Sequence, residues 1–198
     1  MPRRARIDAA GALHHIICRG IERRKIFRDD GDRKLFIERL AHVLKETQSV
    51  CYAWALIPNH FHLLLRTGAS PIKTAMQRLL SGYAGDFNRR HRRIGQIFHN
   101  RYKSILCQQE PYLLELVRYI HLNPLRAHLV GSLDQLDSYP YSGHSALMGE
   151  RPNDWQAVEG ILRLFGGRLS NARRAYRHFV EKGAALGRRP ELTGGGLI

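Results

Sequence analysis

The sequence predicts an α+β domain, in which helices pack on an antiparallel β-sheet. Strand-like and helix-like segments follow in the order strand, helix, two hairpin strands, helix, then one or two extended pieces, which is not the regular alternation of a parallel sheet. Pro58-Asn59 is a turn signal between two apolar stretches, so these stretches form a tight antiparallel hairpin. With 198 residues, 43% of them hydrophobic, the chain can bury one sizeable core.

The first two elements are a strand at residues 12–19 and an amphipathic helix at residues 33–44. His14 and His15 point to opposite faces of the strand, and we interpret them as polar residues at the edge of the core. Negative charge favours a helix start, and the helix is preceded by Asp29, Asp30 and Asp32. These carboxylates could also bind a metal, but helix capping is the simpler interpretation.

The hairpin strands are expected at residues 50–57 and 60–66, and Pro71 then begins a long amphipathic helix. This helix ends in the arginine-rich stretch 88–93. An extended segment at residues 95–106 follows and mixes basic with aromatic side chains. Such a mixture suits stacking and phosphate contact with single-stranded nucleic acid.

A further amphipathic helix covers residues 110–124, with Pro111 in its first turn and Pro124 at its end or kink. Its buried stripe is expected to consist of Leu113, Leu116, Val117 and Ile120. The adjacent face carries Tyr112, Glu115, Tyr119 and Asn123. Tyr119 and Asn123 are therefore expected to lie one helical turn apart.

The C-terminal part is expected to be helical and irregular. Residues 125–145 predict short helical pieces and loops, and short helices are expected at 155–165 and 172–182. The Gly- and Arg-rich end is expected to be a disordered tail. We therefore expect three parts, which are a main α+β domain at 1–132, a helical extension at 133–182 and the tail at 183–198.

The charge balance points to a polyanionic partner. The chain has 32 Lys and Arg against 17 Asp and Glu, a formal net charge of +15. Arginine predominates and its planar fork matches phosphate oxygens, so nucleic acid is the first candidate partner. The residues expected to contact nucleic acid are Arg19, Arg89, Arg90, Arg92, Arg93, Arg101 and Lys103.

Cysteine usage and hydropathy indicate a cytoplasmic protein. Cys18, Cys51 and Cys107 are odd in number, widely spaced and without a CxxC pattern, which fits three buried thiols in a reducing compartment. No run of eighteen apolar residues and no signal sequence occurs, so we expect no membrane association.

His60 and His62 form the most informative pair of residues. Side chains alternate along a strand, so both imidazoles point to one face. The opposite face, which should enter the core, carries Phe61, Leu63 and Leu65. We expect the two histidines on an open face of the sheet, where they could be two ligands of a metal ion.

Tyr119 and Asn123 could complete this metal site as a phosphoryl-transfer centre. The side-chain oxygen of Asn123 would be a third ligand, and oxygen ligands with phosphate favour Mg²⁺ or Mn²⁺. Tyr119 would be the nucleophile, activated by nearby positive charge, because a free phenol with a pKa of about 10 is weak at neutral pH. The residues alone leave the nucleophile open, since its rivals are Tyr83, Tyr102 and Tyr112. Asn123 could instead cap the turn that follows it.

Two segments taken together resemble one known family. Residues 58–64 read Pro-Asn-His-Phe-His-Leu-Leu, and residues 119–126 read Tyr-Ile-His-Leu-Asn-Pro-Leu-Arg. Residues 11–20 and 98–104 add supporting matches in the same order along the chain. The chain resembles the HUH single-tyrosine transposases, and within them it is most similar to the REP-associated tyrosine transposases.

The resemblance implies a ferredoxin-like sheet with the histidine strand at its centre. It implies that His60 and His62 are metal ligands and that Tyr119 forms a 5′-phosphotyrosine link with single-stranded DNA at hairpin-forming repeats. Relatives from insertion sequences often carry Gln four residues after the tyrosine, whereas this chain has the shorter Asn123. The tyrosine could serve its own subunit or the partner subunit of a homodimer.

The leading hypothesis is a metal-dependent, transposase-like DNA nickase and strand transferase. The alternative is a non-catalytic binder of structured single-stranded DNA, which shares the basic surface but needs no metal. A zinc-dependent hydrolase of small phosphoesters is a third hypothesis, and the net charge of +15 argues against it.

Overall fold

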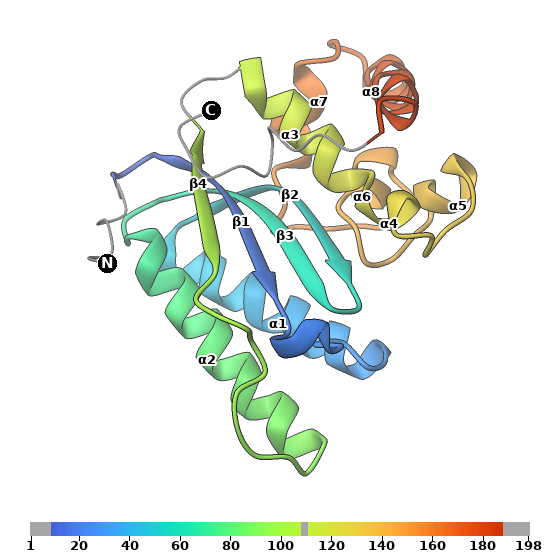
Figure 1. Cartoon of the computed structure of the whole chain (residues 1–198). Helices are drawn as coiled ribbons and strands as arrows, with labels where there is room; N and C mark the ends of the chain where they lie inside the picture. Colours follow the sequence, from blue (N-terminus) through green and yellow to red (C-terminus); the bar gives the residue numbers. More distant parts are fainter. Residues whose placement is uncertain (1–8, 108–110, 188–198) are drawn as a thin grey trace.

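The computed structural model describes residues 9–107 and 111–187. Its centre is a four-stranded antiparallel sheet in the order β2-β3-β1-β4 (Figure 1). The strands are β1 (Leu13–Arg19), β2 (Val50–Ile57), β3 (His60–Arg66) and β4 (Lys103–Cys107). With α1 (Asp30–Thr47) and α2 (Ile72–Arg90) as connections, the order β-α-β-β-α-β confirms the expected ferredoxin-like α+β fold.

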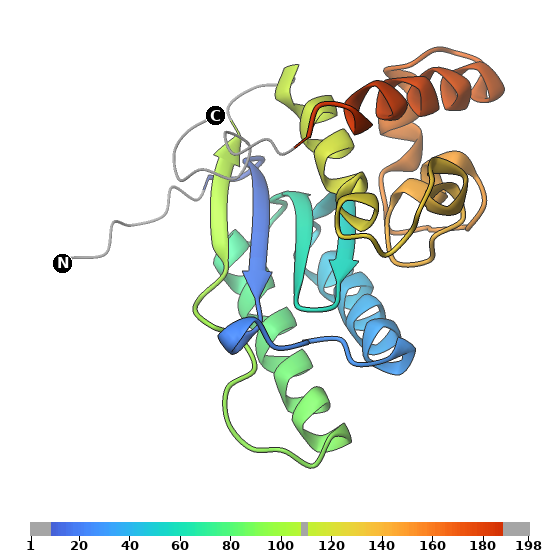
Figure 2. The ribbon, with the colours of Figure 1, turned by 45° about the vertical axis from the view of Figure 1, so that its right-hand side comes forward.

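Helices α1 and α2 pack together on one face of the sheet (Figure 2). Alternation along β3 sends Phe61, Leu63 and Leu65 into this core, as the sequence predicts. All three are at most 1% exposed. Removing so much apolar surface from water is what holds the two helices on the sheet.

The opposite face of the sheet is covered by α3 (Pro111–His121) and the helices that follow it. The apolar stripe of α3 is buried there as expected and consists of Leu113, Leu116, Val117 and Ile120. The expectation that His60 and His62 lie on an open face is therefore wrong for His62, which is 3% exposed. The stripe of α3 needs an apolar partner, and this face supplies it.

Helix α4 and the helices of the extension lie beside β2 and α3 (Figure 1). They are α4 (Asn123–Arg126), α5 (Leu133–Asp137), α6 (His144–Met148), α7 (Val158–Arg163) and α8 (Leu169–Ala184). Backbone hydrogen bonds tie the extension to the edge of β2, since Leu56 N donates to Tyr141 O at 2.9 Å and Ala157 N donates to Cys51 O at 2.8 Å. These bonds cover an edge that would otherwise be free to pair with another chain.

Several element boundaries differ from the sequence prediction. The extended segment expected at 95–106 forms a strand only at its end, while His99 N donates to Arg19 O beside the end of β1. Helix α7 is shorter than expected, whereas α8 begins three residues earlier, at Leu169. The predicted tail at 183–198 lies largely outside the described residues.

The structure tests the expectations about the cysteines and about membrane-spanning helices. Cys18, Cys51 and Cys107 are free and buried, as their spacing indicates. Within the described ranges, the search for membrane spans finds no helix with the length and apolar character to cross a bilayer.

Candidate active site

His60 and His62 lie on β3 and face the side of the sheet that carries α3. Their ring centroids are 5.1 Å apart. Nδ1 of His60 is 2.7 Å from Oδ1 of Asn59, and Nδ1 of His62 is 3.0 Å from Nε2 of His15. Because both Nδ1 atoms have partners, the Nε2 atoms remain available as metal ligands.

Burial keeps both imidazoles neutral, which is the protonation state that a metal ligand requires. Burial, with a smaller contribution from the Arg19 cation, lowers the pKa of His60 to about 4. Burial also lowers the pKa of His62 well below its usual value, and His15, His60 and Arg19 add to this effect. At neutral pH a cation would not need to displace a proton from either ring.

His15 belongs to this site, although the sequence placed it at the edge of the core. It is fully buried, and its ring stacks on His62 with centroids 5.3 Å apart. In the pairing of β1 with β3, His15 is opposite Leu64 and therefore a diagonal neighbour of His62. The alternation along β1 could have assigned His15 to a face, but the register that brings it to His62 is not visible in the sequence.

The ring of Tyr119 lies edge-on against the histidines of its own chain. Its centroid is 5.9 Å from that of His62 and 5.9 Å from that of His15. The side chain is half-buried, and the guanidinium carbon of Arg126 lies 5.3 Å from the ring centroid. One subunit thus brings together the two histidines, the Tyr119 phenol and the Arg126 guanidinium.

The rival tyrosines lie in other surroundings. Tyr83 is fully buried between α1 and α2, its hydroxyl donates to Ile26 O at 2.5 Å, and burial raises its pKa. Tyr102 is buried in the same core. Tyr112 is exposed at the start of α3, about two turns before Tyr119. Among these four tyrosines, Tyr119 is the one whose ring contacts His62.

Asn123 directs its amide nitrogen toward the preceding helix. Nδ2 donates to Tyr119 O at 2.9 Å and to Ile120 O at 3.3 Å. These bonds satisfy carbonyls at the end of α3, just before Pro124 enters α4. The nitrogen is committed to the helix, so Oδ1 is the atom that a cation would use.

Two of the expected nucleic-acid contacts lie on the same face as the histidines. Arg19 is directly opposite His60 in the pairing of β1 with β3, and its side chain is exposed. Lys103 is paired with Ile17, which in turn is paired with His62, so these three form one row across the sheet. Paired residues in antiparallel strands share a face, so both cations flank the histidine pair.

The arginines near the end of α2 have different partners. Arg90 is held by Asp29 and Asp32, and Arg89 pairs with Asp86 at 3.2 Å. The guanidinium of Arg93 lies 5.9 Å from the ring centroid of Phe87. The side chains of Arg92 and Arg101 are exposed. The structure therefore does not gather all the predicted basic residues into one surface.

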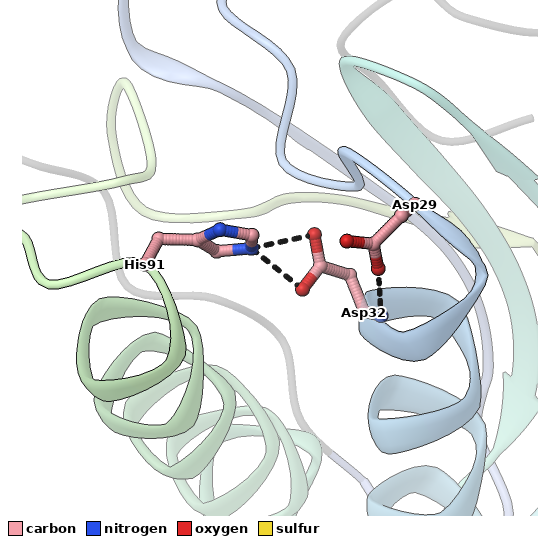
Figure 3. Close-up of side chains that lie close together, drawn as sticks. All are labelled: Asp29, Asp32 and His91. Atoms are coloured by element: carbon pink, nitrogen blue, oxygen red, sulfur yellow. Dashed lines mark hydrogen bonds and ion pairs between the residues drawn. The ribbon is translucent and has the colours of Figure 1, made fainter.

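Asp29, Asp32 and His91 form a separate cluster between α1 and the end of α2 (Figure 3). Their candidate ligand atoms lie within 4.8 Å of one another, so this is a possible Asp/His metal site. Asp29 also caps α1, accepting from Asp32 N at 3.0 Å, which confirms the capping interpretation. Nη1 of Arg90 lies 2.7 Å from both Asp29 Oδ1 and Asp32 Oδ1. Since the Arg90 guanidinium already pairs with both carboxylates, we interpret the cluster as an ion-pair link between the two helices.

The fold and the site define a ferredoxin-like protein whose central strand presents two histidines to a tyrosine on a helix. Comparison with known proteins supports this class. Residues 10–123 match the family model described as "Transposase IS200 like", which spans more than half of the chain. The chain belongs to the IS200-like transposase family.

Among the solved structures that match this chain, we describe one that shares the fold. It is titled "Structure of the REP associates tyrosine transposase bound to a REP hairpin" and aligns with a TM-score of 0.61 and 16% sequence identity. The alignment covers 79% of this chain and 92% of that chain. No curated protein sequence matches this chain.

Proposed function

We propose that the protein is a metal-dependent endonuclease and strand transferase for single-stranded DNA, with Tyr119 as its nucleophile. Membership of a transposase family makes it a protein of a DNA-processing enzyme class. The observation that carries the proposal is the edge contact of the Tyr119 ring with His62 of the same chain, at 5.9 Å between centroids. A single subunit then holds a complete set of reacting groups, and a homodimer would hold two such sets.

The residues present fit a divalent cation such as Mg²⁺ or Mn²⁺. His60 and His62 would hold it through Nε2, and Asn123 would hold it through Oδ1. Such a cation would withdraw charge from the oxygens of a bound phosphate.

The chemistry of Tyr119 is a transesterification. Its phenolic oxygen forms a bond to phosphorus while the bond from phosphorus to the 3′ oxygen breaks. The phenol loses its proton to solvent and the departing 3′ oxygen gains one, so a 5′-phosphotyrosine link and a free 3′ hydroxyl result. The Arg126 guanidinium lies beside the ring and would supply the positive charge that an activated phenol needs. Because one phosphate ester replaces another, the reverse reaction can join a second 3′ end, which is strand transfer.

The proposed substrate is DNA with hairpin-forming repeats, the class of ligand seen with the similar solved structure. Arg19 and Lys103 flank the histidines on the same face and would contact phosphates next to the cleaved bond.

The test compares wild-type protein with Tyr119→Phe and with the control Tyr112→Phe, which alters an exposed tyrosine on the same helix. Each is mixed with labelled single-stranded hairpin DNA and Mn²⁺ or Mg²⁺, and covalent adducts are resolved on a denaturing gel. Wild type and Tyr112→Phe should form the adduct, and Tyr119→Phe should form none. An adduct with Tyr119→Phe refutes the assignment of the nucleophile. Tight hairpin binding without any adduct, in either metal, would establish the non-catalytic binder instead.

A further inference from the structure

A buried chain of hydrogen bonds joins the helical extension to α3, two residues after Tyr119. The hydroxyl oxygen of Tyr176 lies 2.7 Å from Nδ1 of His121 and 2.7 Å from Nδ1 of His144. Nε2 of His144 lies 2.8 Å from Oδ1 of Asp137. His121, His144 and Tyr176 are fully buried. Three elements, α3, α6 and α8, thus meet at one hydroxyl group, and His144 connects them to α5.

The protonation states of these groups determine which group donates and which accepts in each hydrogen bond. Burial alone would raise the pKa of Asp137, but hydrogen bonds from His144 and Arg177 lower it, so the carboxylate is ionised and accepts from His144. Burial lowers the pKa of His144, so the ring is neutral and its Nδ1 must accept from the Tyr176 hydroxyl. The Tyr176 oxygen then accepts from Nδ1 of His121. Every bond of the chain has one donor and one acceptor.

Stability does not account for this arrangement. Nε2 of His121 is buried and has no hydrogen-bond partner in the part of the chain that the structure describes. A buried nitrogen without a partner weakens the folded state, and an apolar side chain at this position would avoid the cost. The hydrogen bond between His121 and Tyr176 is directional, so it fixes one orientation of α3 relative to α8.

Two arginines attach α8 to the same stretch of chain on either side of Tyr119. Nη1 of Arg118 donates to Phe179 O at 3.2 Å, and its guanidinium carbon lies 4.2 Å from the ring centroid of Phe179. Nη2 of Arg126 donates to Gly183 O at 3.3 Å. Arg126 also lies against the Tyr119 ring, so α8 is linked to that ring through one intervening side chain.

We propose that Tyr176 is a positioning residue whose hydroxyl, acting through His121, holds α3 so that Tyr119 lies against His15 and His62. The inference rests on the proposed function of Tyr119 as nucleophile. The extension lies beyond the part matched by the family model. The proposal gives it a defined role in the reaction, which is to position the nucleophile.

The first test is kinetic and uses Tyr176→Phe, which keeps the ring and removes both hydrogen bonds. The matched control is Tyr139→Phe, because Tyr139 packs on the same core cluster and its ring contacts Tyr141. At saturating hairpin DNA, the rate of adduct formation should fall about 10- to 100-fold in Tyr176→Phe, as expected for a small displacement of a reacting group. Hairpin affinity should not change, and Tyr139→Phe should match wild type in both measurements.

The second test does not require activity. Fluorotyrosine placed at position 119 reports the surroundings of that ring by ¹⁹F NMR in the free protein. Tyr176→Phe should shift or broaden the signal, and Tyr139→Phe should leave it unchanged. An unchanged signal in Tyr176→Phe overturns the positioning role, and so does an unchanged rate. If wild type forms no adduct, the proposed function fails, and the NMR signal still decides whether Tyr176 positions Tyr119.

Discussion

Nε2 of His15 lies 3.0 Å from Nδ1 of His62, and both rings are buried. At this distance a single proton lies between the two nitrogens, so one ring donates and the other accepts. When His62 donates through Nδ1, the lone pair of its Nε2 points away from His15 and can bind a cation. In that arrangement His15 is the acceptor, and its bond to Nδ1 favours the tautomer of His62 that a metal ligand needs.

We expect His15→Phe to bind Mn²⁺ about 10- to 100-fold more weakly than wild type, the usual loss when a partner behind a metal-bound histidine is removed. An aromatic ring is kept, but His62 loses the group that orients it. Isothermal titration calorimetry measures the affinity directly. His14→Phe is the control, because His14 points to the other face of β1 and its Nδ1 lies 3.0 Å from Ser104 Oγ. Equal Mn²⁺ affinities for His15→Phe and wild type would exclude this role.

The sequence could predict part of this site because two of its signals are local. The alternation around His60 and His62 assigns them to one face, and the spacing from Tyr119 to Asn123 follows from helix geometry. His15 could not be found in this way, since its contact with His62 spans 47 residues and depends on the strand register. The covering of the histidine face by α3 likewise depends on tertiary packing rather than on local pattern.

Acid should destabilise the protein through its buried neutral histidines. Burial lowers the pKa of His60 to about 4, and in the unfolded chain an imidazole has a pKa of about 6.5. Between these values the unfolded state binds more protons than the folded state, so the free energy of unfolding falls as the pH decreases from 6.5 toward 4. His62, His121 and His144 shift in the same direction and add to the effect.

Urea denaturation at several pH values between 7.5 and 5 measures this dependence. His60→Gln should reduce the slope of unfolding free energy against pH, because it removes one of the groups responsible. His42→Gln is the control substitution, since His42 is exposed on α1. Equal slopes for wild type and His60→Gln would show that this imidazole does not contribute.

Arg90 and Arg92 should have separable roles, although the sequence presents them as one basic stretch. Arg90 bridges Asp29 and the fully buried Asp32, so Arg90→Gln leaves a buried carboxylate with less compensation and should lower the melting temperature. Arg92 is exposed, and Arg92→Gln should leave the melting temperature unchanged. In hairpin binding, Arg92→Gln should reduce the salt slope by about 1, the loss of one phosphate contact.

Thermal denaturation and binding at several salt concentrations distinguish these two effects. The reverse pattern, with Arg92 needed for stability and Arg90 for the salt slope, would mean that Arg90 leaves its ion pairs to contact DNA. Sequence reasoning cannot make this distinction, because the carboxylates that hold Arg90 lie about sixty residues earlier in the chain.

Asn123 combines two roles that a pair of substitutions can separate. Its Nδ2 donates to Tyr119 O and Ile120 O, whereas the proposed metal contact uses Oδ1. Asn123→Asp loses the donor but keeps an oxygen ligand and adds negative charge, so it should bind Mn²⁺ at least as tightly as wild type. Asn123→Ala loses both groups and should bind Mn²⁺ more weakly. Both variants should show faster hydrogen exchange at the end of α3, because both release its carbonyls. If Asp and Ala weaken Mn²⁺ binding equally, Asn123 acts only by ending the helix, and the cation is held without it.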